Sequence, residues 1–359
     1  MTASVTGAAV GAVMEAADAP HTSTDAVNSS ATSRPRLGFL GVGWIGRNRL
    51  EAIARSGFAE IVAVSDPVPE NVSEAQKFAP GSRAADSFDA LLGAQLDGIV
   101  IATPSALHAE QAIAALDGGA AVFCQKPLAR SADETQRVID AARNADRLLG
   151  VDLSYRYTDA MQRIRELVQS GAIGKVFAVD LVFHNAYGPD KAWFFDPVLS
   201  GGGCVIDLGI HLVDLALWTL DNTTVSGASS RLFRNGEPLS LPATDVEDYA
   251  EARIDLDSGA EVRLSCSWSL NAGRDAVIEA AFYGTTGGAA MRNVNGSFFD
   301  FTAERFRGTA RETLSTPPDD WGGRAAVDWV RRLAAGGTYD SEVEHLIDVA
   351  AALDAIYGR

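Results

Sequence analysis

The segment from Gly201 to Asp214 combines residue types that can carry acid–base chemistry. Three successive glycines permit a tight turn, and a helical pattern then runs to Trp218. On such a helix Asp207 and His211 are four residues apart and Asp214 follows three later, so the side chains are predicted to share one face. A carboxylate beside an imidazole can orient a general base and stabilise its protonated form. The same spacing also fits a surface ion pair or a helix-capping aspartate, so the rest of the chain must decide.

A glycine-rich turn near residue 40 predicts a nucleotide site. An apolar run leads into Gly41-Val42-Gly43-Trp44-Ile45-Gly46, and a helical pattern follows to about Arg55. With a strand before it and a helix after it, this motif lets a pyrophosphate approach the backbone and meet the amides of a helix N-terminus. A structural turn is the alternative interpretation.

The second apolar run of this region ends at Asp66, whose carboxylate suits the ribose hydroxyls of NAD and would repel the 2′-phosphate of NADP. The predicted cofactor is therefore NAD. NADP stays possible because Lys77 and Arg83 are not far along the chain.

Lys126 is the second residue placed for chemistry. It follows the apolar run 120–124, and Pro127 restricts its backbone to extended conformations. Ligands of parallel sheets bind beyond the carboxyl ends of the strands, so an ammonium at this point could hydrogen-bond the oxygen of a reacting hydroxyl. A solvated surface lysine is the alternative.

The order of apolar and helical patterns predicts an α/β fold. Short apolar runs alternate with helical patterns up to about residue 153, which indicates a doubly wound parallel Rossmann sheet. Long alternating runs then follow, which indicates an α+β domain with a large, open, mostly antiparallel sheet. We expect a flexible tail (1–34), an NAD(P)-binding domain (35–153), a substrate and oligomerisation domain (154–340) and a C-terminal helix that returns to the first domain (341–359).

The polar and aromatic segment 184–197 precedes the glycine turn and is a candidate for substrate binding. Trp193 could form an apolar wall for a ring, and Tyr187 could hydrogen-bond hydroxyl groups. Alternatively, the aromatic side chains only anchor this loop to the core.

Composition excludes several classes of partner. The formal net charge of the 359 residues is −17, which argues against nucleic acid and anionic membrane surfaces. No apolar run approaches the roughly 20 residues of a membrane span. Residues 1–33 lack Lys and Arg, so they do not resemble a secretory signal, and the protein is predicted to be cytoplasmic. Three widely spaced cysteines indicate buried thiols, and no ligand spacing predicts a metal site.

Taken in order, these motifs resemble the Gfo/Idh/MocA oxidoreductase family, which includes glucose–fructose oxidoreductase and inositol dehydrogenase. The resemblance rests on the glycine turn, Thr103-Pro104, Gln125-Lys126-Pro127 and the segment from Gly201 to His211, and covers residues 36–357. It implies Lys126 as the catalytic lysine, Asp207 and His211 as its acid–base partners, and nicotinamide-side contacts near Thr103, Pro104 and Gln125. Gln125 departs from the family, which often has Glu there.

The resemblance implies hydride transfer between NAD(P) and a ring hydroxyl or ketone of a sugar, inositol or related polyol. We expect His211 to accept the hydroxyl proton, Lys126 to hydrogen-bond the oxygen and Asp207 to hold the imidazole. Asp214 would bind substrate or support His211. Two alternatives are an NAD-dependent glycosidase without net redox change and a sensor without turnover. The expected partners are a small polyhydroxylated substrate and copies of the chain, as a homodimer or homotetramer through the open sheet.

Overall fold

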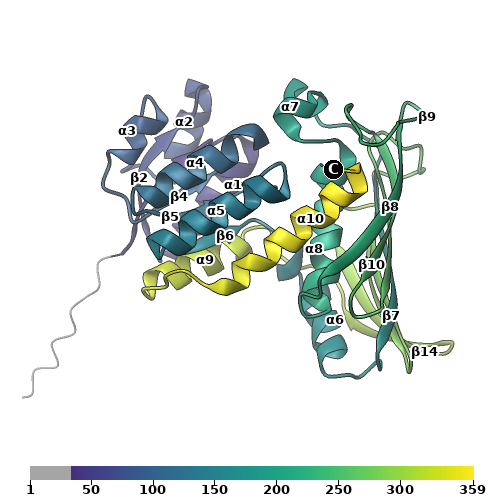
Figure 1. The fold of residues 1–359 in the computed structure, drawn as a ribbon. Helices are drawn as coiled ribbons and strands as arrows, with labels where there is room; N and C mark the ends of the chain where they lie inside the picture. Colours follow the sequence, from purple (N-terminus) through teal and green to yellow (C-terminus); the bar gives the residue numbers. More distant parts are fainter. Residues whose placement is uncertain (1–33) are drawn as a thin grey trace, which may run out of the picture. The chain divides into compact units, whose positions relative to one another are not determined.

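The computed structural model describes residues 34–359, so the predicted tail, apart from Arg34, lies outside the described residues. The described residues form one compact unit. Two β-sheets organise it, and helices separate the sheets (Figure 1). This α/β architecture confirms the predicted fold class.

The first sheet is parallel, with the strand order β3-β2-β1-β4-β5-β6 expected of a Rossmann domain. Its strands are β1 (Arg36–Leu40), β2 (Glu60–Ser65), β3 (Arg83–Ala84), β4 (Gly98–Ile101), β5 (Ala121–Cys124) and β6 (Leu149–Val151). The connecting helices are α1 (Trp44–Ser56), α2 (Pro69–Gln76), α3 (Phe88–Leu92), α4 (Ser105–Asp117) and α5 (Ala132–Ala145). Two separate apolar clusters cover the sheet, one beneath α4 and α5 and the other beneath α1 and the later helix α9 (Arg324–Ala334).

The second sheet has nine strands in the order β15-β14-β13-β12-β7-β11-β10-β8-β9. Every neighbouring pair is antiparallel except β11 and β7, which run parallel. The strands are β7 (Val176–Asn185), β8 (Val225–Arg234), β9 (Glu237–Pro238), β10 (Tyr249–Leu256), β11 (Glu261–Ser267), β12 (Ala276–Gly284), β13 (Gly288–Asn293), β14 (Phe301–Arg307) and β15 (Ala310–Ser315).

Residues 288–315 form three strands at one edge that the sequence reading missed. The last two, β14 and β15, carry charged residues along their length, so the apolar alternation that signals a strand is weak there. Their pairing comes from continuation of the sheet beyond β12.

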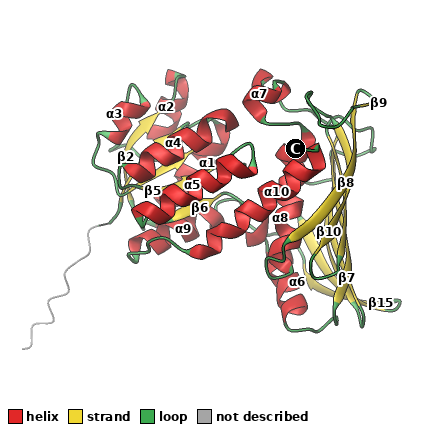
Figure 2. Cartoon of the chain, in the orientation of Figure 1, coloured by secondary structure: helices red, strands yellow, loops and turns green. Residues whose placement is uncertain are grey.

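Helices cover one face of the second sheet (Figure 2). They include α6 (Asp159–Gln169), which follows the short helix η1 (Ser154–Tyr157), and α8 (Ile210–Thr219). The last helix, α10 (His345–Tyr357), is preceded by η4 (Ser341–Glu344) and contacts both α5 of the first sheet and β8 of the second (Figure 1). The predicted boundaries between domains stay predictions.

The stretch Pro197–Thr219 leads into the region of Asp207 and His211. It comprises α7 (Pro197–Ser200), a glycine turn, the π-helical turn η3 (Val205–Gly209) and α8. By length and composition it could cross a membrane, with a mean hydropathy of 1.5, although the sequence reading counted no such run. Its most apolar window is 83% buried within the protein, as expected of a core helix.

Candidate functional site

The glycine-rich turn between β1 and α1 contains glycines that serve two different purposes. Gly41 has a φ of +82°, and a side chain at Gly46 would collide with the carbonyl oxygen of Gly41. These two glycines are required by the fold itself. Gly43 differs, because a Cβ atom there would meet nothing within 4 Å. The space above Gly43 is therefore open for a ligand to approach the backbone.

The start of α1 offers free donors next to that space. The helix has no side-chain cap and no acidic residue in its first turn, so its first amides are available to an anion. Trp44 is exposed and Ile45 half-buried beside them. Asp66 accepts a hydrogen bond from the amide of Val42 at 2.8 Å, which places its carboxylate at the same turn. These residues fit the pyrophosphate and ribose of NAD.

Lys126, which follows β5 of the first sheet, forms an ion pair with Asp207 in η3. Lys126 Nζ lies 2.7 Å from Asp207 Oδ1 and 2.7 Å from the backbone oxygen of Asp207. The other carboxylate oxygen, Oδ2, accepts a hydrogen bond from the indole of Trp268 at 3.1 Å. The structure thus brings together Lys126 and Asp207, which are 81 residues apart in the chain.

His211 lies close to this pair without bonding to it. Its Nδ1 is buried and has no hydrogen-bond partner among the described residues. The ring packs on Tyr155, with 4.9 Å between centroids. Burial and the nearby charge of Lys126 hold the pKa of His211 well below its usual value, so the imidazole is neutral and able to accept a proton.

The expectation that Asp207 holds the imidazole of His211 is not met, because both its carboxylate oxygens accept from Lys126 and Trp268. The cause is local geometry. The chain passes Asp207 in a π turn, in which Ile210 N–H bonds the carbonyl of Val205, five residues back. The four-residue spacing therefore does not superimpose the two side chains as it would in a regular α-helix.

The buried neutral imidazole makes protein stability depend on pH. The unfolded chain binds a proton on His211 near pH 6.5 whereas the folded chain does not, so the free energy of unfolding falls as pH drops below 6.5. Compared with His211→Asn, the wild type should lose up to about 1.4 kcal/mol more per pH unit. Urea unfolding of both proteins at pH 7 and pH 5 measures this, and equal losses would contradict a depressed pKa.

Asp214 is committed to a different set of contacts. It is 1% exposed, and its carboxylate accepts a bidentate pair of hydrogen bonds from Arg156, one of them at 2.7 Å. His345 Nε2 lies 3.7 Å from the same carboxylate. Burial would raise the pKa of Asp214, but Arg156 and His345 outweigh it and hold that pKa below its usual range. Asp214 is thus an anion that ties α8 to η1 and to the start of α10.

The strand ends of the first sheet carry the remaining predicted cofactor contacts. Thr103 and Pro104 lie between β4 and α4, where the Thr103 hydroxyl donates to Gln111 at 2.6 Å. The two ring nitrogens of buried His108 lie 2.7 Å from the carbonyl oxygens of Thr103 and Pro127, and thus bridge the ends of β4 and β5.

Gln125 is 8% exposed and turns its amide to Asp152. The same carboxylate pairs with buried Arg49 at 2.5 Å. The Gln125 side chain thus hydrogen-bonds within the protein, in a buried cluster with Asp152 and Arg49.

The predicted substrate loop is anchored partly to the site. Trp193, in η2 (Ala192–Phe195), stacks on Phe194 with 3.8 Å between ring centroids, and Phe194 and Phe195 pack edge-on to Trp268. Tyr187 is 56% exposed and donates to Asp275 at 2.5 Å. Phe194 and Phe195 of the loop therefore pack against the Trp268 indole that donates a hydrogen bond to Asp207.

The sequence reading missed Trp268, Tyr155 and Arg156 as parts of the site. Trp268 directly follows β11, so its position at a strand end was a usable signal. Tyr155 and Arg156 are in η1, whose contacts with α8 no short motif indicates. Residues 34–359 hold no group of three His, Cys, Asp or Glu side chains suited to a metal ion.

Comparisons with known proteins show to which family the chain belongs. A model of an oxidoreductase family with an NAD-binding Rossmann fold matches residues 36–153, and a model of the GFO/IDH/MocA C-terminal domain matches residues 161–290. A candidate UDP-kanosamine synthase oxidoreductase subunit of Amycolatopsis mediterranei is 31% identical over 68% of this chain and 71% of its own. The chain belongs to the GFO/IDH/MocA oxidoreductase family.

Two further proteins similar to this GFO/IDH/MocA oxidoreductase are named dehydrogenases. The D-glucoside 3-dehydrogenase of Escherichia coli K12 is 28% identical over 74% of this chain and 79% of its own. A levoglucosan dehydrogenase solved with NADH shares the fold, with a TM-score of 0.77 and 21% identity over 90% of this chain and 96% of that chain. The predicted family, the NAD-binding domain and the assignment as an oxidoreductase are confirmed.

Proposed function

We propose that this protein transfers a hydride between NAD(P) and a ring hydroxyl or ketone of a sugar, inositol or related polyol. The observation that carries the proposal is the Lys126–Asp207 ion pair beside a buried, neutral His211. An ammonium and a neutral imidazole together can stabilise and deprotonate an alcohol. The names of relatives that oxidise glucosides, inositol and levoglucosan support this substrate class.

Lys126 has a donor to spare for the substrate. An ammonium has three N–H groups, and two are directed at the carboxylate and backbone oxygens of Asp207. The third can hydrogen-bond the hydroxyl oxygen and stabilise the negative charge that develops on it. Asp207 holds the ammonium in place, and Trp268 in turn holds Asp207.

His211 takes the hydroxyl proton. NAD, when bound, supplies the acceptor for the hydrogen and two electrons that leave the carbinol carbon. As the alcohol becomes a ketone, His211 holds the hydroxyl proton and then passes it to water. Tyr155 packs against the imidazole at a tilt of 56° between the ring planes and restricts its movement.

The sequence made Asp214 a candidate substrate contact. In this proposal Asp214 holds Arg156 in place and does not itself bind the substrate. Its oxygens are saturated by that guanidinium, so a sugar hydroxyl would have to compete with a charged donor. Tyr187 and Trp193 stay candidates for substrate contact, since Tyr187 is exposed and Trp193 is half-buried against Phe194.

NAD rather than NADP is the preferred cofactor in this proposal. Asp66→Asn keeps an acceptor for the amide of Val42 and removes the charge that would repel a 2′-phosphate. The ratio of kcat/KM for NADP to that for NAD should rise about tenfold or more, which corresponds to about 1.4 kcal/mol. Asp117→Asn, at the exposed end of α4, is the control. An unchanged ratio in Asp66→Asn would contradict the role of the carboxylate.

The dehydrogenase names of the relatives do not favour the glycosidase or the sensor. The predicted homodimer or homotetramer through the open sheet stays a prediction, as does the cytoplasmic location. Sugars, inositols and other polyols incubated with NAD or NADP, with reduced nicotinamide measured by its absorbance, test the proposed function. Formation of reduced cofactor with a polyol supports it, and release of product without reduced cofactor contradicts it.

A further inference from the structure

The helical segment that carries Asp207 and His211 starts without a local cap. The first N–H groups of a helix have no partner inside it and need acceptors from elsewhere. Here two residues from remote elements supply all of them. Glu247 accepts from Gly203 at 2.9 Å, from Cys204 at 3.1 Å through its carbonyl, and from Val205 at 2.8 Å.

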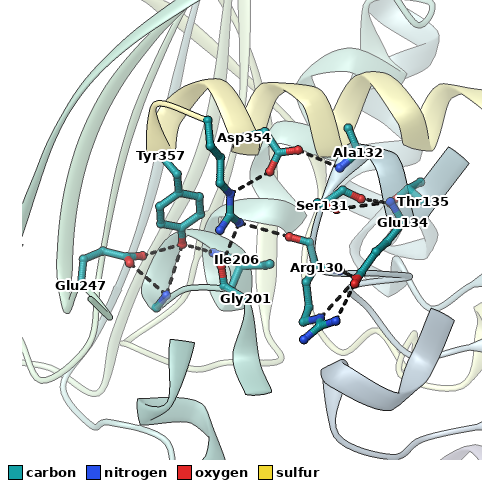
Figure 3. A network of polar contacts seen from close by, with 12 residues as sticks. Arg130, Ser131, Ala132, Glu134, Thr135, Gly201, Ile206, Glu247, Asp354 and Tyr357 are labelled. Atoms are coloured by element: carbon teal, nitrogen blue, oxygen red, sulfur yellow. Dashed lines mark hydrogen bonds and ion pairs between the residues drawn. The ribbon is translucent and has the colours of Figure 1, made fainter. Parts of the chain in front are cut away.

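Tyr357, near the end of α10, completes this cap. Its hydroxyl accepts from the amides of Gly203 and Ile206, both at 3.2 Å, and donates to Glu247 at 2.9 Å (Figure 3). Both side chains are buried, Glu247 completely. The four successive amides 203–206 are thus held by one carboxylate, one carbonyl and one phenol.

Gly202 and Gly203 leave the room that Tyr357 and Glu247 need to approach the turn. A Cβ atom at Gly202 would lie well under 3.0 Å from the Tyr357 hydroxyl, and one at Gly203 equally close to the carbonyl oxygen of Glu247. The sequence indicated only a permissive turn. The structure shows that close approach by Tyr357 and Glu247 requires residues without side chains.

Residues at the end of the same C-terminal helix also form hydrogen bonds with the segment that follows Lys126. Asp354 accepts from the amide of Ala132 at 2.7 Å. The guanidinium of Arg359 donates to the carbonyl of Arg130 at 3.1 Å and to that of Gly201 at 2.8 Å (Figure 3). One helix end therefore binds both the chain just beyond Lys126 and the chain just before Asp207.

Asp207 connects the capped turn to the ammonium of Lys126 through its backbone. Its amide makes the first bond of the segment, to the carbonyl of Gly203 at 3.0 Å, and its backbone oxygen is one of the two acceptors that hold Lys126 Nζ. A shift of the capped amides therefore moves an acceptor of the ammonium directly.

We propose that Tyr357 and Glu247 are positioning residues for hydride transfer, because they set the place of Asp207 and through it that of Lys126 Nζ, which stabilises the reacting oxygen. The inference rests on the proposed function, in which Lys126 contacts the reacting oxygen. A displacement of about 1 Å at a reacting group can lower a rate about a hundredfold, so even a small shift would be measurable.

Two conservative variants test the proposal. Tyr357→Phe removes the hydroxyl and keeps the ring. Glu247→Gln keeps the volume and one acceptor oxygen but turns an NH₂ group toward backbone donors. Burial raises the pKa of Glu247 to about 7, despite the hydrogen bonds it accepts, so assays are run above that pH, where the wild type carries a carboxylate. The matched control is Tyr339→Phe, which loses a tyrosine–glutamate bond of 2.5 Å to Glu344 and has no part in the cap.

The readout is the single-turnover rate of reduced nicotinamide formation, with KM for NAD and the thermal midpoint measured alongside. We expect Tyr357→Phe and Glu247→Gln to slow the single turnover about ten- to a hundredfold. KM for NAD should stay within about twofold, because neither residue contacts the glycine turn at residue 41, and Tyr339→Phe should keep the wild-type rate. A cap with a purely structural role would lower only the thermal midpoint.

The outcomes separate this inference from the proposed function. Wild-type rates in folded Tyr357→Phe and Glu247→Gln, together with a large loss in Lys126→Ala, overturn the inference alone. A wild-type rate in Lys126→Ala overturns the proposed function and the inference with it. If Tyr357→Phe does not fold, Glu247→Gln decides in the same way.

Discussion

Replacing Lys126 with alanine is expected to lower kcat by about 10²- to 10⁴-fold, the usual contribution of a positioned acid–base group. Its Nζ is held at 2.7 Å by two oxygens of Asp207, which leaves one N–H group for the substrate oxygen. Binding of NAD should change little, because the glycine turn and Asp66 make the nucleotide contacts. Steady-state kinetics and titration of NAD by fluorescence measure the two quantities.

Lys77→Ala is the control for this variant. Lys77 also pairs with a carboxylate, that of Glu74 at 2.5 Å, but its side chain, directly after α2, is 63% exposed. An exposed pair of this kind contributes little, so both kcat and stability should stay near wild type. Near-wild-type turnover in Lys126→Ala would remove Lys126 from the mechanism.

Replacing Gly43 with valine should weaken NAD binding about a hundredfold or more while the protein still folds. A Cβ atom at this position has no neighbour within 4 Å, so the fold tolerates it. The valine would occupy the space through which the pyrophosphate must approach the first amides of α1. The dissociation constant for NAD and the thermal midpoint together measure this effect.

Two other glycines serve as comparisons for Gly43→Val. Gly322 is equally open, so Gly322→Val should leave NAD binding unchanged. Gly46→Ala should instead reduce stability, because its Cβ would collide with the Gly41 carbonyl. Tight NAD binding by Gly43→Val would mean that the cofactor does not approach this turn.

Most of the first domain could be predicted from local pattern. Each buried parallel strand reads as a short apolar run followed by a helical pattern, and the glycine turn after the first run indicates a Rossmann domain, whose strand order the sheet has. Lys126 could be found because it stands at the end of such a strand. The edge strands β14 and β15 could not, because their charged residues hide the alternation.

The details of the site were less predictable. Sequence spacing assumed a regular α-helix and therefore paired Asp207 with His211, whereas the π turn lets Asp207 bind Lys126 and Trp268. A single inserted residue in a helical turn leaves no mark in the periodicity of so apolar a segment.

The cap was equally hidden from the sequence. Gly203 meets Glu247 44 residues later and Tyr357 154 residues later. No local sequence pattern connects Gly203 with Glu247 or Tyr357. Glutamate and tyrosine side chains lie more often at the surface or in a core than at the start of a helix.

The most direct test of the account follows the hydrogen itself. A polyol found active in the substrate screen is prepared with deuterium on the carbon that becomes the ketone, and is converted by the protein with NAD. The account predicts one deuterium on the reduced nicotinamide per ketone formed, and transfer slowed by about 10²- to 10⁴-fold in Lys126→Ala. Ketone or cleaved product formed without deuterium on the nicotinamide would contradict it.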